Sequence, residues 1–152
     1  MPALRRLLPL FVAVLALSFA VDCSTLRVQA KGAKAALTWN TDLSKSLEAA
    51  KQSKKFVLVD FYTDWCSMCK KMDKTTYVDP GLVSYLNEKF ICVKLNAEDK
   101  ADGEKEAEKR NVGEFPQALV YTSEGKMLGR ITGTDNPKDY EAALEKLISK
   151  AK

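Results

Sequence analysis

Histidine is absent from this 152-residue chain. Its absence excludes every mechanism that needs an imidazole base and every metal site with a histidine ligand. The chain also lacks a large excess of either charge: it has 24 Lys and Arg and 20 Asp and Glu, which gives a net charge of +4. So small and mixed an excess does not indicate a nucleic-acid-binding protein. With 46% hydrophobic and 29% charged residues, the chain has the balance of one soluble globular domain.

Long hydrophobic runs are missing except at the N-terminus. Two arginines precede an apolar run over residues 7–21, and small residues follow it. This order predicts a secretory signal peptide over residues 1–30, cleaved after Ala30, with Ala20 as the alternative site. An uncleaved membrane anchor is a further alternative, but the run is shorter than the roughly 20 residues that a spanning helix needs. A lipid anchor on Cys23 is disfavoured because an acidic residue precedes it. We therefore expect a periplasmic or secreted protein, in a compartment where disulfides persist.

The remainder of the chain is interpreted as a linker over residues 31–36 and one domain over residues 37–152. Its patterns predict, in order, a weak strand over 36–39, a helix from Asp42 to about Ser53, a strand over 56–62, a helix from near Cys66, a helix restarted at Asp79-Pro80, a strand over 90–95, a charged helix within 98–110, a hairpin of strands 116–121 and 127–132, and a helix opened by Asn136-Pro137. Alternating strands and helices followed by a hairpin and a helix predict an α/β sandwich with a mixed central sheet.

Two cysteines, Cys66 and Cys69, follow directly on the predicted strand 56–62. Residues three apart share one face of a helix, so the two sulfurs can bond. At a helix N-terminus, free N–H groups and the helix dipole stabilise a thiolate on Cys66, and the thiolate is the reacting species. Cys69, one turn further in, would react second. A pair of this kind after a strand in an α/β pattern indicates redox chemistry.

A zinc site and a structural bridge are weaker interpretations of the cysteine pair. A structural zinc site needs four ligands, and the cleaved chain offers only Cys92 besides the pair. A purely structural disulfide would close a loop of two residues and remove little entropy from the unfolded chain. Cys92 itself lies in the alternation of a buried strand and is interpreted as a small core residue. We therefore expect no metal and no cofactor.

Residues 59–70 resemble the active-site segment of the thioredoxin family. Three further segments occur in the family's order, namely 93–96, Phe115-Pro116 and Gly133. The resemblance covers roughly residues 37–150 and implies a thioredoxin-like three-layer sandwich. The run over residues 73–80 is longer than in plain thioredoxin. It is similar to the C-terminal domain of the bacterial transmembrane thiol:disulfide interchange protein, a periplasmic reductase module, which would stand here without a membrane domain.

The resemblance implies roles for four residues in the chemistry. Cys66 would be the attacking thiolate and Cys69 the resolving thiol. Asp60 would relay the proton of Cys69, with Lys94 as the nearby cation. The alternatives are that Asp60 is a strand-end acid that reaches solvent and that Lys94 is a surface lysine.

The resemblance also implies a surface that binds substrate. Trp65 would flank an exposed sulfur; the alternative is that it packs in the core, and the two roles are compatible. Pro116 would follow a cis peptide bond and pack against the disulfide, and Phe115 could pair through its backbone with an extended substrate. Without the resemblance, Pro116 would be read as an ordinary first residue of a strand.

The charges around the pair predict the direction of electron flow. Strong oxidants of this fold stabilise their thiolate, often with a histidine between the cysteines, whereas Ser67-Met68 carries no charge and Asp60 and Asp64 oppose the thiolate. We therefore expect a monomeric reductase of partner-protein disulfides that acts through a transient mixed disulfide, with a membrane protein as electron donor. A thiol oxidase or isomerase, and a non-catalytic binding or chaperone module, are the alternatives.

Overall fold

A five-stranded mixed sheet forms the centre of the molecule in the computed structural model, which describes residues 36–151. The strand order is β1 (Trp39–Asn40), β3 (Phe90–Asn96), β2 (Phe56–Tyr62), β4 (Gln117–Tyr121) and β5 (Met127–Thr132). The first three strands run parallel, β4 pairs antiparallel with β2, and β5 pairs antiparallel with β4 as a hairpin. The predicted signal peptide and nearly all of the predicted linker lie outside the described residues. Within residues 36–151, no helix is both long enough and apolar enough to cross a membrane.

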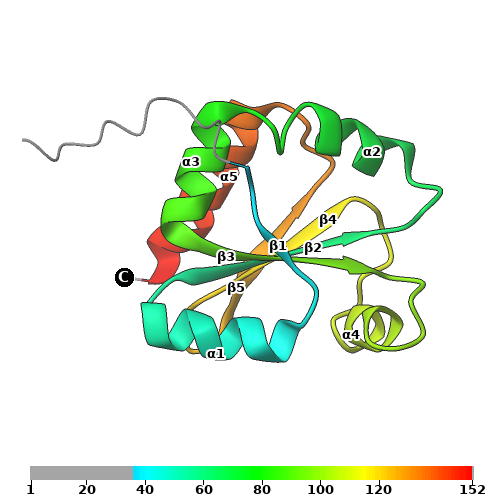
Figure 1. Ribbon diagram of the computed structural model, residues 1–152, viewed down its shortest axis with the longest axis horizontal. Helices are drawn as coiled ribbons and strands as arrows, with labels where there is room; N and C mark the ends of the chain where they lie inside the picture. The colour runs from blue at the N-terminus through cyan, green and yellow to red at the C-terminus, as the bar shows by residue number, and fades with distance from the viewer. Residues whose placement is uncertain (1–35, 152) are drawn as a thin grey trace, which may run out of the picture. The chain divides into compact units, whose positions relative to one another are not determined.

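Helices cover both faces of the sheet and complete three layers (Figure 1). One face carries α2 (Ser67–Lys74), α3 (Pro80–Lys89) and α5 (Pro137–Ile148), and the other carries α1 (Leu43–Ser53) and α4 (Gly103–Lys109). A short 3-10 turn, η1 (Ser149–Ala151), follows α5. The buried apolar residues form two clusters, one on each face of the sheet. The predicted α/β sandwich is confirmed.

The predicted helix starts are confirmed by their caps. The side chains of Asp42, Asp79 and Asn136 each accept backbone N–H groups of the first helical turn. Pro80 and Pro137 occupy first helical positions, where the missing N–H has no partner to lose. Helix α2, which begins at the cysteine pair and is called the motif helix below, therefore ends at Lys74, and α3 begins as a separate helix at Pro80.

The alternation of side chains along β2 decides which residues face the motif helix. Val57, Val59 and Phe61 belong to the cluster on the α1 side, whereas Leu58 belongs to the cluster on the α2, α3 and α5 side. Successive side chains of a strand point to opposite faces, so Asp60 points to the same face as Leu58. The sheet register pairs Asp60 with Lys94 on one side and with Ala118 on the other.

Two elements are shorter than predicted. The strand expected over 36–39 pairs only at Trp39–Asn40, where Asn40 Nδ2 also donates to the carbonyl of Cys92 at 2.9 Å. The charged helix begins at Gly103 and not near residue 98. A Cβ atom at Gly103 would lie 1.8 Å from the carbonyl oxygen of Asn96, so only glycine allows this close approach to the end of β3.

Candidate active site

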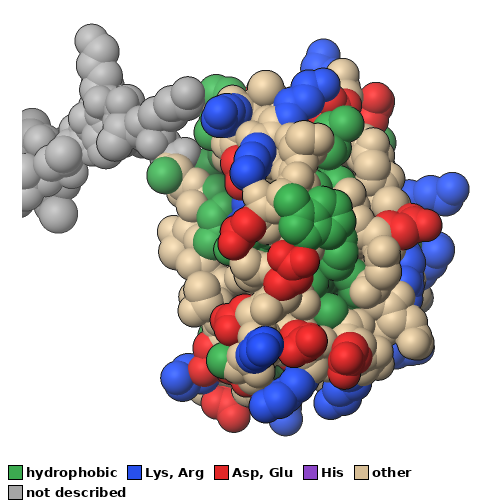
Figure 2. Space-filling view, turned by 90° about the vertical axis from the view of Figure 1, so that its right-hand side faces the viewer, with side chains coloured by type: hydrophobic (Ala, Val, Ile, Leu, Met, Phe, Trp, Pro, Cys, Tyr) green, Lys and Arg blue, Asp and Glu red, His purple; other side chains and the backbone are tan. Residues whose placement is uncertain are grey.

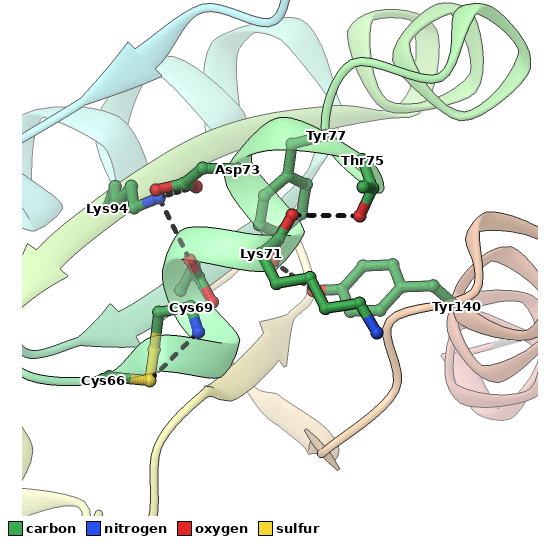
Figure 3. Close-up of polar contacts among 9 residues, drawn as sticks. Cys66, Cys69, Lys71, Asp73, Thr75, Tyr77, Lys94 and Tyr140 are labelled. Carbon is green, nitrogen blue, oxygen red and sulfur yellow. Dashed lines mark hydrogen bonds and ion pairs between the residues drawn. A yellow bond between two sulfur atoms is a disulfide. The ribbon is translucent and has the colours of Figure 1, made fainter.

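Cys66 and Cys69 form a disulfide at the start of α2 (Figure 3). Strand β2 ends at Tyr62, a short turn follows, and Cys66 becomes the N-cap residue of the helix. The Sγ atom of Cys66 accepts the backbone N–H of Cys69 at 3.1 Å, as a capping side chain does. The predicted position of Cys66 at a helix N-terminus is confirmed. A thiolate there would receive this N–H and the positive end of the helix dipole.

Burial does not distinguish the two cysteines in this disulfide state. Cys66 is 4% exposed and Cys69 is 3% exposed, so the exposed sulfur expected at Cys66 is not seen. The difference between the two lies in the helix cap instead. Cys66 has non-helical backbone and caps the helix, whereas Cys69 is inside the first turn.

Trp65 lies on the surface beside the disulfide and not in the core. Its side chain is 67% exposed, and its Nε1 donates to Oε1 of Glu98 at 2.7 Å. Its ring also meets the ring of Phe115 edge-on, with centroids 5.9 Å apart. Trp65 therefore connects three segments: its own segment after β2, the segment of Glu98 after β3, and the segment of Phe115 before β4. Glu98 is absent from the predicted site, although the parallel strands β2 and β3 end at the same edge of the sheet and could have suggested it.

Pro116, in the segment before β4, and Asp60 on β2 line one narrow hollow. The Phe115–Pro116 peptide bond is cis, as expected, and Pro116 is buried. A narrow hollow is lined by Asp60, Pro116, Met72 and Tyr140, together with residues of β4, β5 and the segment after β5. The late glycine of the motif set, Gly133, also lines this hollow and has a φ of 70°. Three motif residues from distant parts of the sequence, Asp60, Pro116 and Gly133, thus line one narrow hollow.

Lys94 bridges the buried carboxylate and the surface. Its Nζ lies 3.8 Å from Oδ2 of Asp60 and also pairs with the carboxylate of Asp73 on α2 (Figure 3). The side chain of Lys94 is only 14% exposed. Its ammonium lies 5.2–5.5 Å from three ring centroids, those of Trp39, Tyr62 and Tyr77. Lys94 is therefore a half-buried, paired residue and not a free surface lysine.

The environment of Asp60 favours its protonated form. The residue is 2% exposed, and none of the described groups hydrogen-bonds its Oδ1. Burial raises the pKa of Asp60 to about 7, the Lys94 ammonium lowers it in part, and the Asp73 carboxylate raises it again. A carboxyl group with such a pKa can hold or release a proton near neutral pH. The alternative that Asp60 reaches solvent is wrong.

Several neighbours of Asp60 were not predicted from the sequence. Asp73 approaches through the ion pair with Lys94, and the hydroxyls of Tyr77 and Tyr140 lie 3.0 Å apart in the buried interior. Pattern reasoning offers no signal for them, because they come from separate elements that meet only in the folded chain. Cys92 is buried and free, and burial raises the pKa of its thiol to about 12. Its interpretation as a core residue is confirmed by this position.

Comparison with known proteins is consistent with the geometry. Residues 43–148 match the family described as a thioredoxin-like domain. Among curated relatives, the thiol:disulfide interchange protein DsbD of Photorhabdus laumondii is 32% identical over 98 residues, 62% of this chain and 17% of the relative. The DsbD of Pectobacterium atrosepticum is 30% identical over 110 residues, 69% of this chain and 18% of the relative. The chain thus spans less than a fifth of the length of these relatives.

Solved structures show the same fold. A protein titled DsbH oxidoreductase superposes with a TM-score of 0.68 and 21% identity, covering 80% of this chain and 92% of its own. A thioredoxin from Thermus thermophilus superposes with a TM-score of 0.66 and 21% identity, covering 74% of this chain and 88% of its own. With the Cys66–Cys69 disulfide at the N-terminus of α2, these matches lead to one conclusion. The chain belongs to the thioredoxin-like family of thiol:disulfide oxidoreductases, and Cys66 and Cys69 are its redox-active pair.

Proposed function

We propose that this protein is an extracytoplasmic reductase that passes two electrons from the Cys66–Cys69 dithiol to disulfides of partner proteins. The observation that carries the direction is the buried Asp60, whose charge is compensated only in part, by the ammonium that Lys94 shares with Asp73 and by the hydroxyl of Tyr77. A second negative charge beside it is costly, so the thiolate form of the reduced pair is only moderately stabilised. A couple whose reduced form is weakly stabilised gives up its electrons readily.

The reaction proceeds through a mixed disulfide. The Cys66 thiolate attacks one sulfur of the partner disulfide, forms the mixed disulfide and releases the other sulfur as a thiolate. The Cys69 thiol then loses its proton to the Asp60 carboxylate and attacks Sγ of Cys66. This closes the disulfide, releases the second partner sulfur and leaves the partner reduced by two electrons. Lys94 acts as the cation that stabilises ionised Asp60 before the proton arrives.

Three residues supply the surface on which the partner is held. The exposed ring of Trp65 and the ring of Phe115 offer apolar contact beside the disulfide. The backbone of Phe115 pairs with an extended partner segment, and Pro116, which lacks an N–H, donates no hydrogen bond to that segment. We propose that the protein acts as a monomer.

The electron donor and the location follow from the same proposal. Each cycle leaves the pair oxidised, so a donor must reduce it again, and a membrane protein that carries electrons outward is the class that fits. Relatives named thiol:disulfide interchange proteins support such an exchange. Export with cleavage after Ala30 would deliver the domain to this donor. The intact mass of the protein isolated from the periplasm tests that step, and an uncut chain or a mature N-terminus at Val21 would contradict it.

Equilibration of the pair against a glutathione series tests the direction. We expect a potential below about −200 mV, clearly more negative than the about −120 mV of a strong oxidant such as DsbA. Replacing Ser67-Met68 by Pro-His should raise the potential by tens of millivolts, because an imidazolium stabilises the thiolate. A wild-type value near −120 mV would overturn the reductase proposal and favour the oxidase. Reduction of insulin with a small dithiol as donor separates the reductase from a binding module, which would show no turnover.

A further inference from the structure

The rings beside the disulfide form an apolar ridge, which we define by Trp65 and Phe115. Trp65 is the most exposed large hydrophobic residue of the described part, and the two rings support each other edge-on. Figure 2 looks onto the side of the molecule where β2 ends and α4 begins, and it shows hydrophobic side chains in the middle of the face with acidic side chains gathered beside and below them. The surface around the ridge is thus apolar at its centre, with acidic side chains directly beside and below it and Lys and Arg side chains further out (Figure 2).

Three carboxylates edge this ridge, and we call them the acidic rim: Asp64, Glu98 and Glu114. Asp64 and Glu114 are the chain neighbours of the two ridge residues, and Glu98 accepts the indole N–H of Trp65. All three side chains are exposed. None of them pairs with a lysine or arginine among residues 36–151, where other acids such as Asp42, Asp135 and Glu106 do.

The lysines near the motif do not neutralise this rim. Lys71 pairs with Asp135, and Lys94 is committed to Asp60 and Asp73. Lys70 and Lys74 are exposed on α2 and Lys100 is exposed after β3, but among residues 36–151 none of these three lysines forms an ion pair with a rim acid. A partner seated on the ridge therefore meets the rim charges at short range, where screening by salt is weakest.

We propose that the acidic rim selects partner proteins whose reactive disulfide is flanked by lysine or arginine side chains. This inference rests on the proposed reductase function and names its substrate class. Complementary charges speed encounter and fix orientation, and like charges placed against each other slow it. A disulfide flanked by basic residues is reduced fast, and one flanked by acidic residues is reduced slowly.

Small symmetric disulfides of matched size test the rim directly. Cystamine carries two ammonium groups, 3,3′-dithiodipropionate carries two carboxylates, and bis(2-hydroxyethyl) disulfide is neutral. Cys66 attacks one sulfur and expels one thiolate, and Cys69 then expels the second. The protein dithiol becomes a disulfide, the probe becomes two thiols, and the two dithiol protons end on those thiols. The measured quantity is the ratio of second-order rate constants for cystamine and dithiodipropionate, with the reduced full chain.

The rim variant is Asp64→Asn/Glu114→Gln, because neither side chain makes an ion pair or a hydrogen bond in the described part. The matched control is Glu48→Gln/Glu88→Gln, which changes the net charge equally at exposed positions of α1 and α3. Both rate constants of a ratio come from the same Cys66 thiolate, so a change in its nucleophilicity cancels. The ratio also does not depend on the fraction of active protein.

We expect the cystamine preference to fall about five-fold in the rim variant at about 0.01 M salt and to stay near the wild-type value in the control. At about 1 M salt, where the Debye length is about 3 Å, wild type and rim variant should converge. Equal ratios in wild type and rim variant, or an equal fall in the control, would overturn the inference while leaving the reductase intact. Failure of reduced wild-type protein to react with any of the three probes would instead overturn the proposed function, and the inference with it.

Discussion

The ammonium of Lys94 lies 3.8 Å from the carboxylate of Asp60, and the two residues are partners in the register of neighbouring parallel strands. Because paired residues of parallel strands point to the same face, the sheet itself brings the charge pair together under the motif helix. Lys94 compensates the charge of Asp60 only in part, because Lys94 also binds Asp73 and because Oδ1 of Asp60 has no hydrogen-bond partner among the described residues. The predictions on protonation below follow from this arrangement.

Replacing Asp60 by asparagine should stabilise the protein at alkaline pH. The pKa of Asp60 is raised from 3.8 to about 7 on folding, so the folded state binds more protons between pH 4 and 7, and stability falls as pH rises through that window. The amide of the variant cannot ionise, so the variant escapes this loss. Urea unfolding of the oxidised proteins should give Asp60→Asn an advantage of up to about 4 kcal/mol at pH 8 and little at pH 4.

A matched exchange at an exposed aspartate serves as its control. Asp102 is exposed and makes no capping hydrogen bond, so Asp102→Asn should leave the pH dependence of the wild type in place. If Asp60→Asn shows the same advantage at pH 4 as at pH 8, Asp60 is not the group that titrates.

Changing the two charges next to Asp60 should move its pKa in opposite directions. The Lys94 ammonium lowers the pKa of Asp60 and the Asp73 carboxylate raises it. Lys94→Gln should therefore move the titration above pH 7, and Asp73→Asn should move it below. Carbon-13 NMR of the Asp60 carboxyl group across pH 4–9 measures both shifts. Shifts of the same sign in the two variants would show that something other than charge controls Asp60.

Alkylation of the reduced protein should modify Cys66 first. Its sulfur caps α2 and receives the N–H of Cys69, an interaction that favours the thiolate. Cys92 provides an internal control, because burial raises the pKa of its thiol to about 12 and leaves it protonated at neutral pH. Mass spectrometry of peptides after brief iodoacetamide treatment at mildly acidic pH should find label at Cys66 and almost none at Cys92. Preferential label at Cys69 would reverse the assignment of attacking and resolving thiols.

The start of α4 should not tolerate a side chain at Gly103. A Cβ atom there meets the backbone carbonyl of Asn96, which cannot move without disturbing the end of β3. We expect Gly103→Ala to lower the free energy of unfolding by about 1–3 kcal/mol. Gly113→Ala is the matched control, since nothing lies within 4 Å of a Cβ at that position, and its effect should be neutral or slightly stabilising. Equal stability of the two variants in urea would refute the packing argument.

Local features of the chain were sufficient to predict most of its helices and strands and its chemical motif, although the weak first strand and the charged helix are shorter than predicted. The caps Asp42, Asp79 and Asn136 start helices through contacts within four residues, so their sequence neighbours suffice to place them. The apolar run of β2 likewise identifies a buried strand, and the spacing of Cys66 and Cys69 within one helical turn identifies the redox pair.

The distances and partners of residues from distant segments could be identified only in the folded chain. The resemblance had implied Lys94 as the cation near Asp60, and the strand register places the two residues side by side. Helix packing adds Asp73, and the common edge of β2 and β3 joins Trp65 to Glu98, neither of which was predicted. Burial, and with it the raised pKa of Asp60, arises only when helices and sheet exclude water together. The chain therefore encodes its elements locally, whereas the electrostatics of its site arise from long-range packing, which no short stretch of sequence contains.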